Sequence, residues 1–310
     1  MKRIKKSMIG IAAVLLLLAG CSASNEAAST DGTACPRETE RLQPSACQEE
    51  PVDRVEEVDW SGYFDGMSGA AVVYDPSESC CRIYNRELAE TRRSPCSTFK
   101  IISSLIGLEN RTIIPENSLR VWSGEVFWNS DWNRDIAFAE AFRSSCVWYF
   151  REVTDEIGKT AIQAELYRLQ YGNCDISDWE GKQNTNNNNP ALTGFWIESS
   201  LKISPIEQTQ VMERIFGDRS VYTAQTREQL MQVMQSEPQE AEDIAVYGKT
   251  GMGKAEGVVV DAWFTGFSDL KDRRVYFCVY LGESPGKDVS STKAKEIAAK
   301  VLLDYAARPV

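Results

Sequence analysis

Two side chains three residues apart could form a nucleophile and its base in this 310-residue chain. Ser97 and Lys100 form an S-x-x-K motif in a segment of helical pattern, so they share one helix face. A serine needs a base to become a nucleophile, and a lysine one turn away can serve if burial keeps its amine neutral or if the amine is modified. The pair predicts nucleophilic catalysis. Alone, S-x-x-K is a weak signal, and the commoner interpretation is a helix-capping serine and a surface lysine.

A second hydroxyl, Ser145, opens an S-x-V motif that ends at Val147. We expect it on an apolar helical stretch, where a serine could relay a proton between a nucleophile and a leaving group. Taken by itself, this serine would more often be a residue whose hydroxyl faces the core and has no chemical role.

A third motif, Lys249-Thr250-Gly251, follows a predicted strand over 244–249. A lysine and a threonine hydroxyl at a strand edge suit a substrate carboxylate, and the glycine would let the substrate approach the backbone. The same residues resemble the end of a phosphate-binding loop. That motif needs a glycine where this chain has Asp243 and a helix where a strand is predicted, so we disfavour it.

Strands are predicted on both sides of a mostly helical middle. The expected strands are 69–75, 80–84, 244–249, 257–267 and 274–281, and the expected helices are 95–109, 137–152, 159–169, 205–216, 223–236 and 291–307. We predict an α/β fold of the α+β kind. It consists of an antiparallel sheet with terminal helices packed on it and a helical subdomain inserted between strands. The ligand site is expected in the cleft between the two parts.

Composition excludes several kinds of chemistry. The chain has no histidine, which rules out a Ser-His-Asp triad, a Cys-His pair and imidazole-bound zinc. Its formal net charge of −11 argues against a nucleic-acid partner. Nine cysteines include no C-x-x-C pair, which argues against zinc ribbons and thioredoxin-like chemistry. The sequence does not decide whether Cys96 and Cys146 form a disulfide.

The N-terminus is typical of an export signal. Residues 1–20 combine four early lysines and arginines with a short apolar run, and Leu18-Ala19-Gly20-Cys21 resembles a bacterial lipobox. We expect residues 21–57 to be a flexible tether with a lipidated Cys21, and residues 58–310 to form the functional domain. The expected location is the outer face of the bacterial cytoplasmic membrane, with the lipid bilayer as a partner. The alternative is an ordinary cleaved signal in which Cys21 is incidental.

Taken together and in this order, the three motifs are far more specific than any one alone. Residues 60–307 resemble the class D (OXA-type) serine β-lactamases, which are related to penicillin-sensing receptor domains. Further matches are Tyr171-Gly172-Asn173 and the run FWIESSLKIS over 195–204. Class A enzymes match less well because they carry S-D-N where this chain has Ser145-Cys146-Val147.

The resemblance implies a β-lactam substrate and a covalent mechanism. In that family the serine opens the β-lactam ring and forms an acyl-enzyme, which matches Ser97. The S-x-x-K lysine reacts with CO2 and becomes an N-carboxylated general base, which matches Lys100. By the same match, Trp196 donates its indole N–H to the carbamate. Phe99 and Val147 could supply the apolar surroundings that keep the lysine amine neutral. No metal and no cofactor other than CO2 is implied.

The remaining roles also follow from the resemblance. Ser145 would carry a proton towards the β-lactam nitrogen, with Lys249 nearby. Lys249 and Thr250 would hold the substrate carboxylate. The backbone N–H groups of Ser97 and Met252 would form the oxyanion hole.

One departure concerns the carboxylate. Family members often bind it with an arginine from the C-terminal region, which has no clear counterpart here. Lys293 is a possible substitute. Its ammonium is a point charge and lacks the two parallel N–H donors with which an arginine binds a carboxylate.

Four functions are compatible with these features. The first is a β-lactam hydrolase that confers resistance, and the second is a receptor that holds the acyl group. Such receptors are usually fused to membrane helices and a protease domain, whereas this chain has one export signal. A peptidoglycan transpeptidase or carboxypeptidase shares two motifs but not the Trp196 run. The last is a non-catalytic lipoprotein binding module, for which the agreement with the three motifs would be a coincidence. The oligomeric state stays open.

Overall fold

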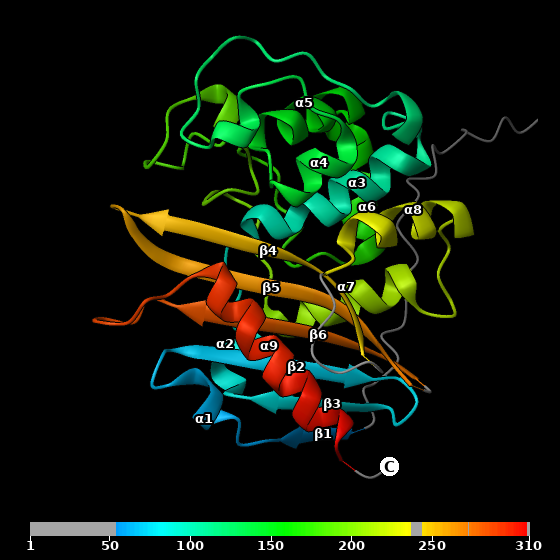
Figure 1. Ribbon diagram of the computed structural model, residues 1–310, viewed down its shortest axis with the longest axis vertical. Helices are drawn as coiled ribbons and strands as arrows, with labels where there is room; N and C mark the ends of the chain where they lie inside the picture. Colours follow the sequence, from blue (N-terminus) through cyan, green and yellow to red (C-terminus); the bar gives the residue numbers. More distant parts are fainter. Residues whose placement is uncertain (1–53, 237–243, 272, 309–310) are drawn as a thin grey trace, which may run out of the picture. The chain divides into compact units, whose positions relative to one another are not determined.

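A computed structural model describes residues 54–236, 244–271 and 273–308 (Figure 1). Contacts divide the chain into residues 1–49 and residues 50–310, and all described residues belong to the second unit. The predicted export signal, Cys21 and most of the predicted tether lie outside the described residues. Within the described part, no helix has both the length and the apolar character needed to cross a membrane.

The centre of the domain is a six-stranded sheet in the order β1-β3-β2-β6-β5-β4. Its strands are β1 (Arg54–Glu57), β2 (Gly69–Asp75), β3 (Cys80–Tyr84), β4 (Ala245–Ala255), β5 (Val258–Leu270) and β6 (Arg273–Gly282). The five strands β3, β2, β6, β5 and β4 each run antiparallel to their neighbours among them, as predicted. The hairpin of β2 and β3 has the predicted bounds. β4 runs on to residue 255, so the K-T-G motif lies within the strand rather than at its end.

The edge strand β1 corrects the prediction in two ways. It pairs parallel with β3, so the sheet is mixed, and it lies within residues assigned to the flexible tether. Its sequence, RVEE, lacks the alternation of apolar and polar residues that signals a strand. Tertiary contacts hold it in place instead, including an ion pair of 3.0 Å between Arg82 and Glu56.

Helices cover both faces of the sheet (Figure 1). α1 (Ser61–Phe64) and α9 (Ser291–Ala306) lie on one face, where Ala71, Val73 and Phe277 point. α2 (Arg86–Glu90) and α7 (Pro205–Phe216) lie on the other face, because successive strand residues point in opposite directions.

The inserted helical subdomain lies beyond β4 (Figure 1). It contains α3 (Lys100–Glu109), α4 (Phe138–Arg143), α5 (Val147–Ile157), α6 (Lys159–Leu169) and α8 (Ala224–Met234). The described residues also form four 3₁₀ turns: η1 (Cys96–Phe99), η2 (Pro115–Asn117), η3 (Ser130–Trp132) and η4 (Pro190–Leu192). The large apolar core of this subdomain is continuous with the α7 face of the sheet.

The helix predicted over 137–152 is two helices separated by a turn. The backbone N–H of Ser145 donates to the Phe142 carbonyl at 3.2 Å, and that of Cys146 donates to the Ala141 carbonyl at 2.8 Å. These two bonds form a Schellman motif, which ends α4. Ser145 occupies the left-handed position of that motif, with φ of 58°, where glycine is usual. It therefore lies in a turn, not on a helix as predicted.

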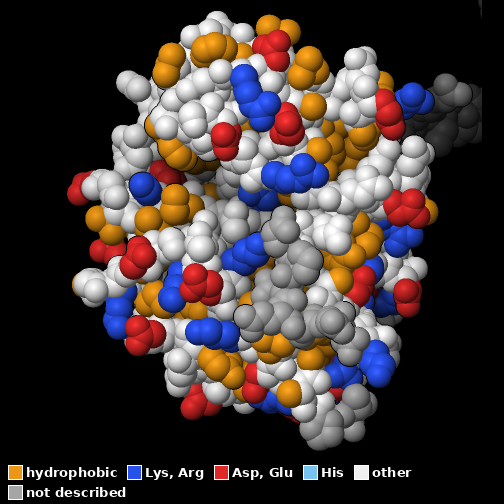
Figure 2. Space-filling model, in the orientation of Figure 1, with side chains coloured by type: hydrophobic (Ala, Val, Ile, Leu, Met, Phe, Trp, Pro, Cys, Tyr) orange, Lys and Arg blue, Asp and Glu red, His pale blue; other side chains and the backbone are white. Residues whose placement is uncertain are grey.

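The described cysteines are all free thiols: Cys80, Cys81, Cys96, Cys146, Cys174 and Cys278. The disulfide between Cys96 and Cys146 is therefore not formed. On the face shown in Figure 2, lysine and arginine side chains are interspersed with acidic and apolar ones.

Candidate active site

The nucleophile and its candidate base lie at the start of the helical subdomain. Ser97 is in the η1 turn, and Lys100 is the first residue of α3. The Lys100 Nζ donates a hydrogen bond to the Ser97 Oγ at 2.9 Å. Ser97 is half-buried, whereas Lys100 is only 1% exposed. The predicted pairing of these two side chains is confirmed.

Burial changes the acid–base chemistry of Lys100. Its ammonium position lies 5.6 Å from the centre of the Phe150 ring, within the apolar core of the helical subdomain. Removal from water disfavours the charged form, which lowers the pKa of Lys100 to about 8. A substantial share of the amine is therefore neutral near physiological pH, as a base or a nucleophile towards CO2 requires.

The strand β4 approaches the Ser97 turn closely at Gly251. A Cβ atom at this position would lie 2.9 Å from the Pro95 carbonyl oxygen and 2.9 Å from the Thr98 Cγ2. The glycine was predicted to give the substrate access to the backbone. In the structure, it allows the strand that carries Lys249 to pack directly against the turn that carries Ser97.

Lys249 is a second buried amine in the site. It is 4% exposed, and its Nζ donates to the Thr250 carbonyl oxygen at 3.2 Å and to the Thr250 Oγ1 at 3.3 Å. Burial, followed by the positive charge of Lys100, holds the pKa of Lys249 well below its usual value. The K-T-G lysine and threonine thus form one polar unit next to the S-x-x-K pair. Met252, the next residue of β4, is 40% exposed.

The turn with Ser145 is linked to Lys249 through Phe142. The Ser145 backbone bonds to the Phe142 carbonyl, and the Phe142 ring centre lies 5.7 Å from the Lys249 Nζ. The Ser145 Oγ is buried and makes no hydrogen bond within the described residues. Val147 begins α5, is half-buried and packs against the core that surrounds Lys100. The three motifs are therefore brought together as predicted.

Trp196 supplies a buried donor without a partner. Its ring stacks on Phe99, with 5.6 Å between ring centres, and its Nε1 makes no hydrogen bond within the described residues. A glycine at position 194 lets the chain pass against the ring, since a Cβ there would lie 2.3 Å from the indole. An indole N–H without a partner, a buried lysine amine with a lowered pKa and aromatic walls are features that a carboxylated Lys100 would use.

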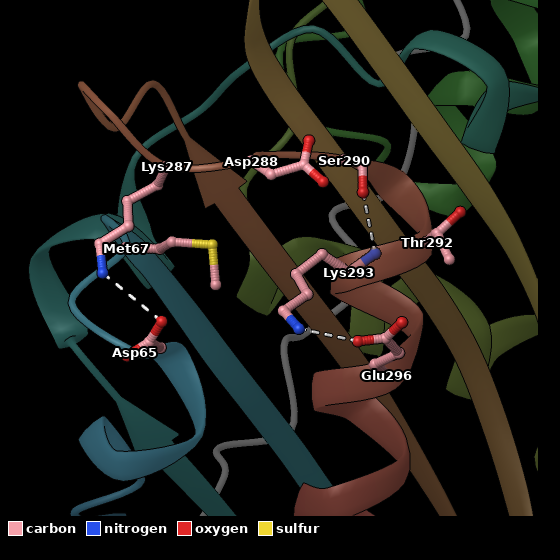
Figure 3. A pocket seen from close by; sticks show the side chains of 8 residues that line it. All are labelled: Asp65, Met67, Lys287, Asp288, Ser290, Thr292, Lys293 and Glu296. Atoms are coloured by element: carbon pink, nitrogen blue, oxygen red, sulfur yellow. Dashed lines mark hydrogen bonds and ion pairs between the residues drawn. The ribbon is translucent and has the colours of Figure 1, made fainter.

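Lys293 is not joined to this constellation. Its ammonium lies 2.9 Å from Glu296 on the same helix, near the start of α9. Figure 3 shows that it lines a depression together with Asp65, Met67, Lys287, Asp288, Ser290, Thr292 and Glu296. None of those residues belongs to the three motifs. The predicted carboxylate contact is therefore unsupported for Lys293.

Several residues of the site escaped prediction. Phe142 and Phe150 lie beside the two lysines, and nothing in the sequence separates such aromatics from ordinary core residues. Glu198 and Asn186 bind the end of β4. Of these residues, only Glu198 could have been singled out from the sequence, because it lies in the FWIESSLKIS run.

The chain matches the family model "Penicillin binding protein transpeptidase domain" over residues 69–303. It is 30% identical over 242 residues to the probable β-lactamase YbxI of Bacillus subtilis, covering 78% of this chain and 82% of that protein. The solved structure of a class D β-lactamase from Bacillus subtilis is 28% identical, with a TM-score of 0.69, covering 82% of this chain and 98% of that one. The chain belongs to the penicillin-binding transpeptidase family, among the class D β-lactamases and their sensor relatives.

The sensor side of this family is equally similar. The regulatory protein BlaR1 of Bacillus licheniformis is 30% identical over 255 residues, which cover 81% of this chain. The matched part is only 39% of BlaR1, so the chain spans about two fifths of that protein's length. The predicted resemblance and fold class are thus confirmed, and the chain carries a penicillin-binding fold.

Proposed function

We propose that this protein hydrolyses β-lactam antibiotics through an acyl-enzyme on Ser97, with N-carboxylated Lys100 as general base, and so confers β-lactam resistance. The observation that carries this proposal is the 2.9 Å contact between the Lys100 Nζ and the Ser97 Oγ in a chain without histidine. The base of Ser97 must therefore be something other than imidazole, and Lys100 is in hydrogen-bonding contact.

Acylation follows from this contact. The Ser97 Oγ forms a bond to the β-lactam carbonyl carbon while its proton passes to the base at Lys100. The ring C–N bond then breaks, and the nitrogen takes a proton carried through the Ser145 Oγ with Lys249 nearby. The Ser145 hydroxyl supports this role, because it is buried without a hydrogen-bond partner among the described residues.

Deacylation uses the same groups. A water molecule gives a proton to the base and attacks the ester carbonyl carbon, and Ser97 leaves with a proton, which releases the opened product. When present, the carboxylate on Lys100 supplies the base for both half-reactions. Its fit rests on the low pKa of the Lys100 amine and on the free Trp196 indole N–H. The CO2 requirement of this protein is part of the proposal.

Substrate binding is assigned to the edge of β4. Lys249 and Thr250 would bind the substrate carboxylate, and the backbone N–H groups of Ser97 and Met252 would bind the carbonyl oxygen as it gains charge. Gly251 lets the two backbones approach each other closely, which supports this assignment. Val147, which is half-buried, would form an apolar wall beside the bond that breaks, whereas the predicted substrate contact of Trp196 is not supported, because its side chain is only 1% exposed.

A receptor that keeps its acyl group is the second candidate. The similarity to BlaR1, a regulatory protein, supports it as directly as the similarity to YbxI supports hydrolysis. The two functions differ only in whether the ester on Ser97 is hydrolysed. A peptidoglycan transpeptidase or carboxypeptidase would likewise form an acyl-enzyme through Ser97.

Two variants test the hydrolase proposal. Ser97→Ala should form no adduct with benzylpenicillin, because the attacking oxygen is gone. Lys100→Ala should lose at least about 10²-fold in hydrolysis, the scale of a general base. Hydrolysis by Lys100→Ala at the parent rate would contradict the proposed base. Circular dichroism of both variants would show that the fold is kept.

We also propose that the protein is exported and anchored through a lipid on Cys21. The lipobox-like sequence supports this, although it lies outside the described residues. Growth with radiolabelled palmitate should label the parent and leave Cys21→Ala unlabelled. Equal labelling of both would contradict the anchor.

A further inference from the structure

Glu198 connects the segment that carries Trp196 to the strand that carries the K-T-G motif. Its carboxylate accepts the backbone N–H of Lys254 through Oε1, and its Oε2 accepts the Asn186 Nδ2 at 2.7 Å. Lys254 lies two residues after Met252, at a bulge in β4 between Gly253 and Lys254. The end of this strand is therefore held from outside the sheet.

Asn186 completes the connection on the other side. Its Nδ2 also donates to the Lys254 carbonyl oxygen at 2.5 Å, and its Oδ1 accepts the Glu256 N–H at 2.8 Å. The Asn186 side-chain amide thus bonds to the backbone of 254–256, in the hairpin of β4 and β5, as a neighbouring strand would. We call Glu198, Asn186 and the backbone of 254–256 the hairpin clamp.

The clamp is also joined to the Ser97 turn. The Glu198 N–H donates to the buried Ser94 Oγ at 2.7 Å, and Ser94 lies three residues before the nucleophile. A Cβ at Gly253 would lie 2.9 Å from the Cys96 Sγ and 3.2 Å from the Glu198 Oε1. Gly253, the residue after Met252, is thus packed between the clamp and the nucleophile's neighbour.

Glu198 adopts a left-handed backbone conformation, with φ of 51°. For a residue other than glycine this conformation is unfavourable, and it persists where surrounding contacts hold it. A glycine would satisfy the backbone more easily. This chain instead has a glutamate here, and its two carboxylate oxygens accept hydrogen bonds from the Lys254 N–H and the Asn186 amide.

We propose that Glu198 is a positioning residue for acylation, which holds the Met252 N–H at the right distance from Ser97 through the hairpin clamp. This inference rests on the proposed function, because it assumes that Met252 contributes to the oxyanion hole. Without the carboxylate, the bulge and Met252 lose their outer support. The acyl-transfer transition state then loses part of its electrostatic stabilisation.

The test uses Glu198→Gly, which relieves the backbone conformation while it removes the carboxylate. The acylation rate constant with a fluorescent penicillin should fall about 10- to 100-fold, the scale of a misplaced catalytic group, while the melting temperature stays close to that of the parent. A residue that only shaped the turn would instead give acylation at the parent rate, with a melting temperature equal to or above that of the parent. Glu198→Gln keeps one acceptor oxygen and should lie between the parent and Glu198→Gly.

Asp65→Gly is a matched control, because Asp65 is also an acidic residue with φ of 48°, outside the clamp. It should be acylated at the parent rate. Parent-like acylation of both Glu198 variants would overturn the inference while leaving the proposed function intact. A parent protein that the penicillin does not acylate would overturn both.

Discussion

The amine of Lys100 donates a hydrogen bond of 2.9 Å to the hydroxyl of Ser97 from a position that is almost completely buried. Most buried lysines are paired with an acid, because an isolated ammonium is costly in an apolar interior. Here the amine faces a hydroxyl and an aromatic ring instead. The site therefore shifts Lys100 towards its neutral or chemically modified form, and the first two predictions below depend on that shift.

Activity should depend jointly on pH and CO2. With a Lys100 pKa of about 8, about half of the amine is neutral at pH 8 and about one hundredth at pH 6. Only the neutral amine reacts with CO2, so the carboxylated fraction should fall as the pH falls through 8. Hydrolysis in degassed buffer should therefore decline from pH 8 to pH 6, and added bicarbonate should restore it. Activity that is independent of bicarbonate at both pH values would contradict a carboxylated base.

Trp196→Phe should weaken the retention of CO2 without disturbing the core. Phenylalanine keeps the stacking on Phe99 but removes the unpartnered Nε1–H donor. A hydrogen bond to a charged group is worth about 1.5–3 kcal/mol, so the bicarbonate concentration for half-maximal activity should rise about 10- to 100-fold. The ¹³C signal of the carbamate, titrated with labelled bicarbonate, measures this directly. An unchanged titration would show that Trp196 is only part of the core.

Lys249→Met should stabilise the protein while it removes activity. The folded state lowers the pKa of Lys249, so the unfolded state binds its proton more readily. This penalty is fully present below the folded-state pKa and vanishes as the pH rises above the unfolded value near 10.5. Methionine removes the penalty, so the free energy of unfolding should rise by about 1–3 kcal/mol at pH 7, and by less near pH 10.

The exposed Lys300 provides the control, because Lys300→Met should change the free energy of unfolding by less than about 0.5 kcal/mol. Denaturant titration measures both variants. A destabilised Lys249→Met protein would show that this amine supports the fold.

Gly251→Ala should separate β4 from the Ser97 turn. The new Cβ would meet the Pro95 carbonyl oxygen and the Thr98 side chain at 2.9 Å, so the strand has to shift. We expect a loss of about 1–3 kcal/mol in stability and slower acylation by benzylpenicillin. Gly62→Ala is the control, since a Cβ at Gly62 meets nothing within 4 Å. Normal acylation by Gly251→Ala would mean that the close approach is not needed for the reaction.

Much of the fold was predictable because its elements carry strong local patterns. The hairpin of β2 and β3 matches its predicted bounds, since apolar and β-branched residues mark both strands. β4 extends past its predicted end because two glycines in KTGMG weaken the strand signal, whereas pairing with β5 continues to Ala255. The short strand β1 is held by backbone pairing and an ion pair with β3, which no local pattern reveals.

The candidate site was predictable from motif order but not in its geometry. Ser145 was expected on a helix because the residues around it are apolar, and the break comes from its left-handed backbone in a Schellman motif. Gly251 was assigned to substrate access, although its nearest atoms belong to the nucleophile's own turn. Lys293 was chosen for its position near the C-terminus, and it pairs with Glu296. Such relationships between distant segments arise only when the chain is folded.

The central claim is that Ser97 is acylated and then released. Time-resolved intact mass spectrometry of the protein mixed with benzylpenicillin tests it directly. We predict an adduct of the mass of the intact penicillin that appears on the parent, decays as opened product accumulates, and never forms on Ser97→Ala. An adduct that persists for hours while no product accumulates would contradict hydrolysis and identify a receptor or a peptidoglycan enzyme. The absence of any adduct on the parent would contradict the assignment of Ser97 as the nucleophile.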